Sequence, residues 1–190
     1  DGTRPSLFLV GSSMGGALAL QTSLDPSIAP HVTGLVMLAP LLSLKVSSIE
    51  QSALSALSSL IPTWAVIPSS STSSSAQYRD TQRRQQCDDD TMSYKGKMKV
   101  QSALTCVELA KQTRTSLDRV SCPFLIMIGS EDVVVDNTDA AKELMENAKT
   151  DVGERTLKEY KALHGLLCET QPLRGEIEQD LMDWVNQRCA

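Results

Sequence analysis

The stretch LFLVGSSMGGALAL, residues 7–20, constrains the fold more than any other part of the 190-residue chain. Its first four residues, 7–10, are all large and apolar, which predicts a short strand buried on both faces within a parallel sheet. Residues 15–24 are rich in Ala and Leu and predict a helix. Because few residues separate the two segments, the strand and the helix must meet in a tight turn.

Gly11, Ser13 and Gly15 occupy alternate positions in that turn and form a G-x-S-x-G pattern. In this pattern the serine sits in a strained strand-to-helix turn that holds its hydroxyl above the sheet. We expect both glycines to be required because a side chain there would collide with the neighbouring strand or helix. The helix N-terminus would also direct free N–H groups at a charge developing above the serine. The pattern predicts a nucleophile elbow with Ser13 at its tip and Ser12 pointing elsewhere; the alternative is a βα turn without chemistry.

Further segments continue the alternation of strands and helices. Residues 32–40 are a second apolar run that ends at Pro40, and strand, helix and strand in this order predict a parallel βαβ unit. Later patterns predict strands at 123–128 and 155–160 and helices at 137–150 and 174–189. We therefore expect an α/β fold with a mostly parallel, doubly wound sheet. Residues 1–42 and 120–190 would form its core, and residues 43–119, the cap segment, would be a helical insertion.

The cap segment contains apolar residues at helical spacing, followed by a serine run at 69–75 that predicts a loop. Leu54, Leu57, Ile61 and Trp64 could form an apolar rim that binds a lipid or an acyl chain. The alternative is a small helical subdomain that is simply packed against the core.

Reactive side chains follow three predicted strands, in the order Ser13, an acid and His164. Working residues of parallel α/β sheets lie just beyond the carboxyl ends of strands, and this order is that of the α/β hydrolases. A serine needs an imidazole to take its proton, and the imidazole needs a carboxylate to fix its tautomer. His31 precedes a strand, so we expect it at the opposite end of the sheet. Among the nearby acids Glu131, Asp132, Asp136 and Asp139, geometry favours Asp132 and then Asp136.

These residues resemble one branch of the α/β hydrolases, which contains monoacylglycerol lipases, lysophospholipases and plant caffeoylshikimate esterases. The resemblance is carried by GSSMGG around Ser13, PFLIMIGSEDVVVD around Asp132 and LHGLLCE around His164. It extends into the cap segment, where QYRD and YKGKMKVQSALTCVEL are similar to segments of the plant members. It implies the α/β-hydrolase fold, and it implies Asp132 as the acid because the family acid ends a G-x-x-D stretch.

The resemblance also implies the oxyanion hole and the role of the cap. One donor is the N–H that follows the nucleophile, here Met14, and a His-Gly loop earlier in the family's chains supplies the other. That loop and the family's first strands would lie upstream of residue 1, so we expect the natural protein to be longer. A missing donor costs roughly 2.7–4 kcal/mol of transition-state stabilisation, so we expect this chain alone to be weakly active or inactive. The family's cap covers an apolar acyl channel, which favours acyl binding by the cap segment.

Composition excludes other classes of protein. A chain of 190 residues with 41% hydrophobic content is most simply one domain, and a net charge of −5 argues against nucleic acid as a partner. Neither the five cysteines nor the two histidines have metal-ligand spacing, so we expect reduced thiols, no metal and no organic cofactor. No apolar run approaches the roughly 18 residues of a membrane span. We expect a cytoplasmic protein whose cap touches membrane surfaces transiently, unless a signal peptide precedes the chain.

The sequence thus predicts a serine hydrolase that cleaves carboxylic esters through an acyl-serine intermediate, most simply a monoacylglycerol lipase-like enzyme. Lysophospholipid or phenolic-ester hydrolysis and acyl transfer to an alcohol would use the same three residues. A hydrolase-fold binding module with vestigial residues and a purely structural fragment are the non-enzymatic alternatives.

Overall fold

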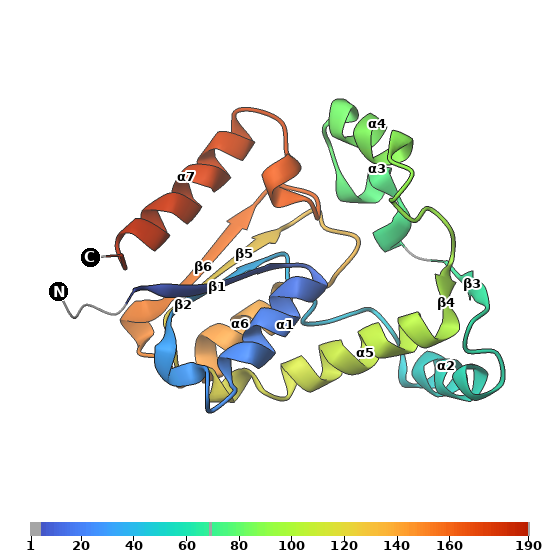
Figure 1. The fold of residues 1–190 in the computed structure, drawn as a ribbon, viewed down its shortest axis with the longest axis horizontal. Helices are drawn as coiled ribbons and strands as arrows, with labels where there is room; N and C mark the ends of the chain where they lie inside the picture. The colour runs from blue at the N-terminus through green and yellow to red at the C-terminus, as the bar shows by residue number, and fades with distance from the viewer. Residues whose placement is uncertain (1–4, 69, 190) are drawn as a thin grey trace.

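The computed structural model describes residues 5–68 and 70–189. A parallel sheet with the strand order β1-β2-β5-β6 forms its centre (Figure 1). The strands are β1 (Leu7–Ser12), β2 (Val32–Leu38), β5 (Phe124–Gly129) and β6 (Arg155–Tyr160). Each strand coincides with a predicted one, and the parallel pairing confirms the α/β prediction.

Helices cover both faces of this sheet (Figure 1). The helices α1 (Met14–Ser23) and α6 (Thr138–Asn147) lie on one face, and α7 (Leu173–Asn186) lies on the other. Short 3₁₀ turns connect the core elements at Ala29–His31, Leu117–Arg119, Val152–Glu154 and Leu166–Cys168. The sheet is therefore wound on both sides, as a parallel sheet requires when its strands are apolar on both faces.

The two central strands carry the core. In β2, Leu35 and Met37 pack toward α1 and α6, whereas Val36 and Leu38 pack toward α7. The residues of β5 alternate in the same way, because successive side chains of a strand point to opposite faces. Burial on both faces, which the apolar runs predict, is confirmed for β2 and β5.

Among the described residues, β1 does not show this burial on both faces. This strand lies at the edge of the sheet, and it pairs with β2 alone among the described residues. Phe8 and Leu9 are partly covered by α7 and α1 respectively, but Val10 is 57% exposed.

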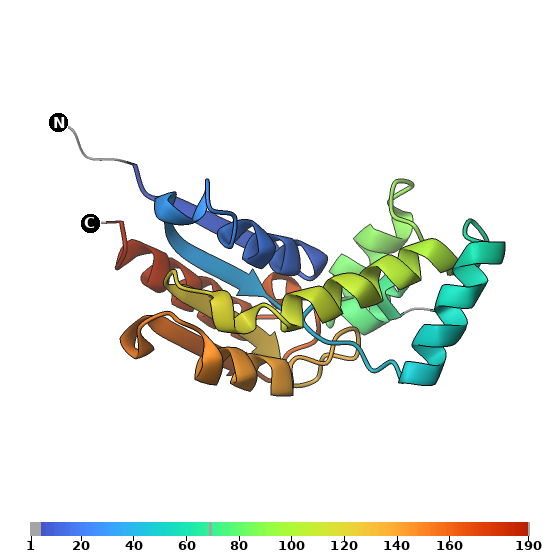
Figure 2. The same cartoon turned by 90° about the horizontal axis from the view of Figure 1, so that it is seen from below.

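The cap segment lies beyond the carboxyl ends of the strands, at the same end of the molecule as the turns that follow β1 and β5 (Figure 1). Its elements are α2 (Ser48–Leu60), β3 (Ala65–Ile67), α3 (Ser74–Gln77), α4 (Thr81–Asp89), β4 (Met98–Lys99) and α5 (Val100–Arg114). The strands β3 and β4 form a separate antiparallel pair. Figure 2 shows α5 running from this part of the molecule back to the core.

Packing within the cap segment centres on α2 and α5. Leu54 of α2 is buried against Val100, Ala103 and Leu104 of α5. The far end of α5 contacts the core, where Ala110 packs with Ala17 of α1. Because one continuous helix belongs to both parts, α5 fixes the cap segment relative to the sheet.

The loop prediction for residues 69–75 is wrong in part. Ser69 lies outside the described residues, whereas Ser70–Thr72 form a 3₁₀ turn and Ser74–Gln77 form the helix α3. The Ser73 N–H donates to the Ser70 carbonyl, and the Gln77 side chain donates to the Ser71 carbonyl. These local hydrogen bonds stabilise the turn and the short helix without burying apolar side chains. Hydrophobic patterning therefore cannot predict the two elements.

Candidate active site

Ser13 alone separates β1 from α1 and has an unusual backbone conformation. Its φ and ψ angles are 53° and −122°, a region that L-residues rarely adopt. The Ser13 N–H donates to the Leu38 carbonyl over 2.9 Å, and the Ser13 carbonyl accepts from the Leu41 N–H over 2.8 Å. The end of β2 therefore holds the turn in place. Ser13 is half-buried and Ser12 is exposed.

The glycines around this turn are required for different reasons. A Cβ added at Gly11 would lie 2.1 Å from the Gly15 carbonyl oxygen, and one added at Gly16 would lie 2.7 Å from Pro40. Gly11 thus permits the close approach of α1, as the motif predicts, and Gly16 permits the approach of the chain after β2. At Gly15 a Cβ meets no atom within 4 Å, so the predicted collision there does not occur among the described residues.

Asp132 and His164 form a buried pair at the carboxyl ends of β5 and β6. The His164 Nδ1 lies 2.8 Å from the Asp132 Oδ2, and the two side chains are 7% and 5% exposed. The other carboxylate oxygen of Asp132 accepts hydrogen bonds from the N–H groups of Val134 and Val135. Because an ionised carboxylate only accepts, Nδ1 carries the proton and Nε2 is left as the basic nitrogen.

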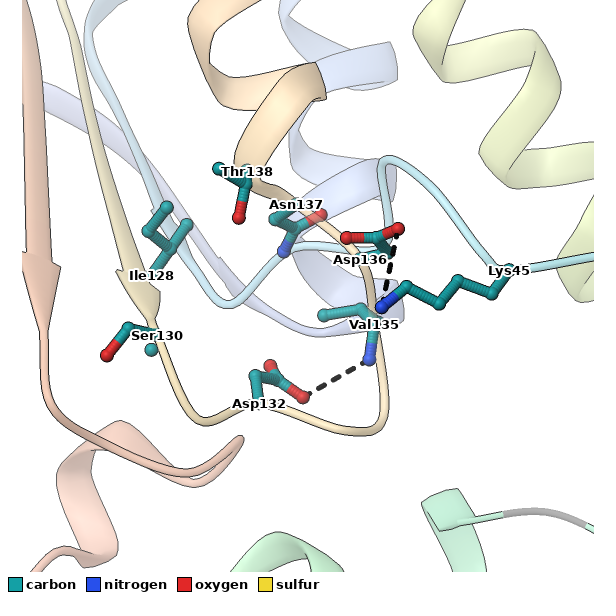
Figure 3. A pocket seen from close by; sticks show the side chains of 9 residues that line it. Lys45, Ile128, Ser130, Asp132, Val135, Asp136, Asn137 and Thr138 are labelled. Carbon is teal, nitrogen blue, oxygen red and sulfur yellow. Dashed lines mark hydrogen bonds and ion pairs between the residues drawn. The ribbon is translucent and has the colours of Figure 1, made fainter.

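The other candidate acids are engaged elsewhere. Asp136 turns toward Lys45, with 3.9 Å between the charged groups, whereas Asp132 bonds to its own loop (Figure 3). Glu131 pairs with Arg79 and lies 3.9 Å from Lys161, and Asp139 belongs to the first turn of α6. Of the acids that the sequence leaves open, the structure joins Asp132 to His164.

Ser13 lies at the same end of the sheet as this pair but on a different strand. The strands β2 and β5 separate β1 from β6, and His31 precedes β2 at the opposite end. Within residues 5–68 and 70–189, no hydrogen bond joins the Ser13 hydroxyl to His164. Such contacts are often long in ligand-free enzymes and tighten when a substrate binds.

A cavity of about 840 Å³ opens beside Ser13 and Met14. Its walls are mostly apolar and come from the loop after β2, from α2 and α5, and from the loop that follows Asp132. Leu54 and Leu57, two of the four residues predicted to bind substrate, line it. Ile61 does not, because it packs against the α2–α5 contact, and Trp64 is 60% exposed outside the cavity.

Hydrophobic periodicity in the sequence does not predict several of the residues that line the cavity. Leu41, Leu44 and the three valines 133–135 lie in loops, where no helical or strand period marks an inward side. Their closeness in the sequence to Pro40 and Asp132, at the ends of β2 and β5, is the available signal. Cys106 of α5 also lines the cavity, and desolvation raises the pKa of its thiol, which favours the neutral form.

Between residues 5 and 189, leaving out residue 69, no three His, Cys, Asp or Glu side chains come together as a metal site would require. None of the helices described combines the length and the apolar character needed to cross a bilayer.

Known proteins resemble this chain over almost its whole length. The chain is 28% identical over 188 residues to human monoglyceride lipase, and the match covers 97% of this chain and 59% of the relative. The mouse and rat monoglyceride lipases are 24% and 25% identical over the same shares. The chain therefore spans about 59% of the length of the curated relatives it matches.

Solved structures share the fold. A monoacylglycerol lipase from Paleococcus ferrophilus superposes with a TM-score of 0.79 at 17% identity, over 97% of this chain and 69% of that one. A soluble variant of the monoglyceride lipase from Saccharomyces cerevisiae, solved with a substrate analogue, gives 0.80 at 17% identity, over 97% and 63%. The sequence pattern of the serine aminopeptidase S33 family matches residues 1–171. The chain therefore belongs to that family and, within the α/β hydrolases, to the branch that contains the monoglyceride lipases.

Proposed function

We propose that the protein is a serine hydrolase that cleaves carboxylic esters of long acyl chains, with monoacylglycerols as the first candidate substrates. Ser13 would be the nucleophile, His164 the general base and Asp132 the acid that orients it. The observation that carries the proposal is the buried Asp132–His164 pair, which lies at the same end of the sheet as the Ser13 turn.

The proposed reaction has two steps. His164 Nε2 takes the proton of Ser13 while Oγ attacks the ester carbonyl, and Asp132 stabilises the imidazolium that forms. The Met14 N–H begins α1 and has no hydrogen-bond partner in the described part of the chain, so it and the helix end can stabilise the oxyanion. The alcohol leaves with the proton from His164, and water then repeats the sequence on the acyl-serine.

The cavity supports a long, apolar acyl group. Its volume of about 840 Å³ and its mostly aliphatic lining suit a hydrocarbon chain better than a charged or aromatic acid. The names of the curated relatives, monoglyceride lipases, agree with this class of substrate. Lysophospholipids and phenolic esters are alternatives that product analysis distinguishes.

A substrate panel tests the proposal on the full-length natural protein. Monoacylglycerols from octanoyl to oleoyl, a lysophospholipid and a phenolic ester are each incubated with wild type, Ser13→Ala and the matched control Ser12→Ala. We expect fatty acid release from monoacylglycerols by wild type and Ser12→Ala, and none by Ser13→Ala. Faster cleavage of the phenolic ester would replace the substrate class, and equal release by Ser13→Ala would contradict the nucleophile.

We also propose that the cap segment touches the lipid surface from which the substrate comes. Ile49 and Leu60 of α2 are 80% and 79% exposed, Trp64 follows them, and α2 carries a single charged residue, Glu50. An exposed apolar face with so little charge is typical of interfacial helices. Trp64 fluorescence should shift to the blue on phosphatidylcholine vesicles and Trp64→Phe should show no shift, because Trp184, the other tryptophan, is buried. An unchanged wild-type spectrum would contradict the contact.

A further inference from the structure

Arg79 of the cap segment reaches two acidic residues of the core. It lies between α3 and α4, and its Nε donates to the Glu169 carboxylate over 3.0 Å. Its Nη2 donates to the Glu131 carboxylate. One guanidinium therefore joins the loop after β5 to the loop after β6, and its planar fork of donors suits two carboxylates at once.

Each of these carboxylates is tied to one member of the Asp132–His164 pair. Glu131 directly precedes Asp132, and its N–H donates to the Ala162 carbonyl in the histidine loop. Glu169 accepts a hydrogen bond over 2.7 Å from the N–H of Leu163, the residue directly before His164. The side chain of Glu169 is 1% exposed, so Arg79 provides the charge that compensates a buried carboxylate.

Neighbouring cap residues hold the same histidine loop. The Gly165 N–H, one residue after His164, donates to the Gln77 carbonyl over 2.8 Å. The ring of Tyr78 packs so closely against Gly165 that a Cβ there would lie 2.6 Å from the ring. Tyr78 is held in turn by Arg84, which donates to its carbonyl. Residues 77–79 thus contact the histidine loop at Gly165 and Glu169, and they reach Leu163, before the histidine, through the Glu169 carboxylate.

The charges around Glu131 favour its ion pair with Arg79. The hydrogen bond from Arg79 lowers the pKa of Glu131, so this carboxyl stays ionised over a wider pH range. Lys161 also faces Glu131, but it lies 3.9 Å away and is almost fully exposed. Water therefore screens Lys161 strongly, and Arg79 is the dominant partner.

We propose that Arg79 is a positioning residue, a clamp through which the cap segment keeps the acid loop and the histidine loop in register. This inference rests on the proposed function, because it gives Arg79 the role of holding the catalytic Asp132–His164 pair in place. Loss of the Arg79 contacts would leave Ser13 and the cavity intact. The His164 imidazole, however, would no longer be held at hydrogen-bond distance from the Asp132 carboxylate. Misplacement of a catalytic group by about 1 Å typically costs on the order of 100-fold in rate.

The test compares Arg79→Met, Arg79→Lys and the matched control Arg83→Met in the full-length protein. Arg83 is exposed on the neighbouring helix α4, and its side chain contacts Gln86. We expect kcat to fall about 100-fold in Arg79→Met and about tenfold in Arg79→Lys, which keeps a charge but reaches a single carboxylate. KM and the Arg83→Met rates should stay at wild-type values. A wild-type kcat in folded Arg79→Met would overturn the proposal.

A second readout does not depend on turnover. Comparison of wild type with His164→Ala assigns the proton NMR signal of the His164 Nδ1–H. We expect this signal to broaden or vanish in Arg79→Met and to persist in Arg83→Met. Should Arg79→Met fail to fold, Glu131→Gln removes the more exposed arm alone, and an unchanged signal and kcat there would overturn the clamp. An inactive wild type with an Arg79-dependent signal would contradict the proposed function and leave the clamp supported.

Discussion

Ser13 combines backbone strain with a hydroxyl that forms no hydrogen bond within the described part of the chain. A side chain held at φ 53° and ψ −122° costs about 1–3 kcal/mol, which the hydrogen bonds to Leu38 and Leu41 must offset. The hydroxyl of a serine at a helix N-cap usually accepts a hydrogen bond from a backbone N–H of the first turn. Ser13 makes no such bond to α1. The hydroxyl is thereby left available for other partners.

The close approach at Gly11 predicts a large effect on stability. In Gly11→Ala the new methyl group would meet the Gly15 carbonyl oxygen at 2.1 Å, so β1 and α1 must separate. We expect a loss of about 3 kcal/mol or more in the free energy of unfolding, measured by urea denaturation. The control is Gly153→Ala, whose added Cβ meets no atom within 4 Å. Equal stability of the two variants would contradict the packing described here.

The choice of acid predicts a contrast between two neighbouring aspartates. Asp132→Asn would replace the acceptor of His164 Nδ1–H by an amide that can hold the ring in the wrong tautomer. We expect kcat to fall by about 10⁴-fold with little change in stability. Asp136→Asn removes a solvent-exposed partner of Lys45 and should stay within about twofold of wild type. Comparable losses in both variants would argue against Asp132 as the acid.

At this scale the sequence predicts polar partners better than apolar ones. The distance from the end of a strand selects Asp132 over Asp136, since the first turn beyond β5 faces the histidine loop. Nothing local distinguishes Leu57, which lines the cavity, from Ile61, which packs on α5, because both lie on the apolar side of one helical period. Which of the two residues lines the cavity depends on where α2 ends and on how it packs against α5.

Strands and helices of the core follow from the sequence because hydrophobic periodicity defines them. Residues 7–10 are as apolar as the buried residues 35–38 but are less buried here, because β1 pairs with β2 alone among the described residues. The short elements α3, β3 and β4 do not follow from the sequence. They have two to four residues each, too few for a period, and contacts with the rest of the molecule determine them.

The link between the cap segment and the acid loop predicts a pH-dependent stability. Arg79 lowers the pKa of Glu131 below its ordinary 4.5, so its ion pair stabilises the fold above about pH 4.5 and is lost as pH falls through the lowered pKa. We expect wild type to melt above Glu131→Gln at about pH 7 and the difference to shrink as the pH is lowered below 4.5. The exposed Glu108 provides the control variant Glu108→Gln. A difference that grows on acidification would contradict the pairing.

The whole molecule places a cavity between a rigid sheet and the cap segment. Leu57 lines this cavity, whereas Leu60 lies one turn further along α2 and is mostly exposed. Leu57→Trp should therefore shorten the space for an acyl chain. We expect kcat/KM for palmitoyl esters to fall about tenfold and that for acetyl esters to stay unchanged, measured with p-nitrophenyl esters. Leu60→Trp should change neither, and an equal effect of both variants would place the acyl chain elsewhere.

Ser13, activated by His164, is the proposed nucleophile on which the whole mechanism depends. The most direct measurement treats the full-length protein with a fluorophosphonate probe and maps the modified residue by mass spectrometry. We expect labelling at Ser13 that is lost in His164→Ala and retained in His31→Ala, since His31 precedes β2 at the far end of the sheet. A folded wild-type protein that stays unlabelled, or a label that persists in His164→Ala, would contradict it.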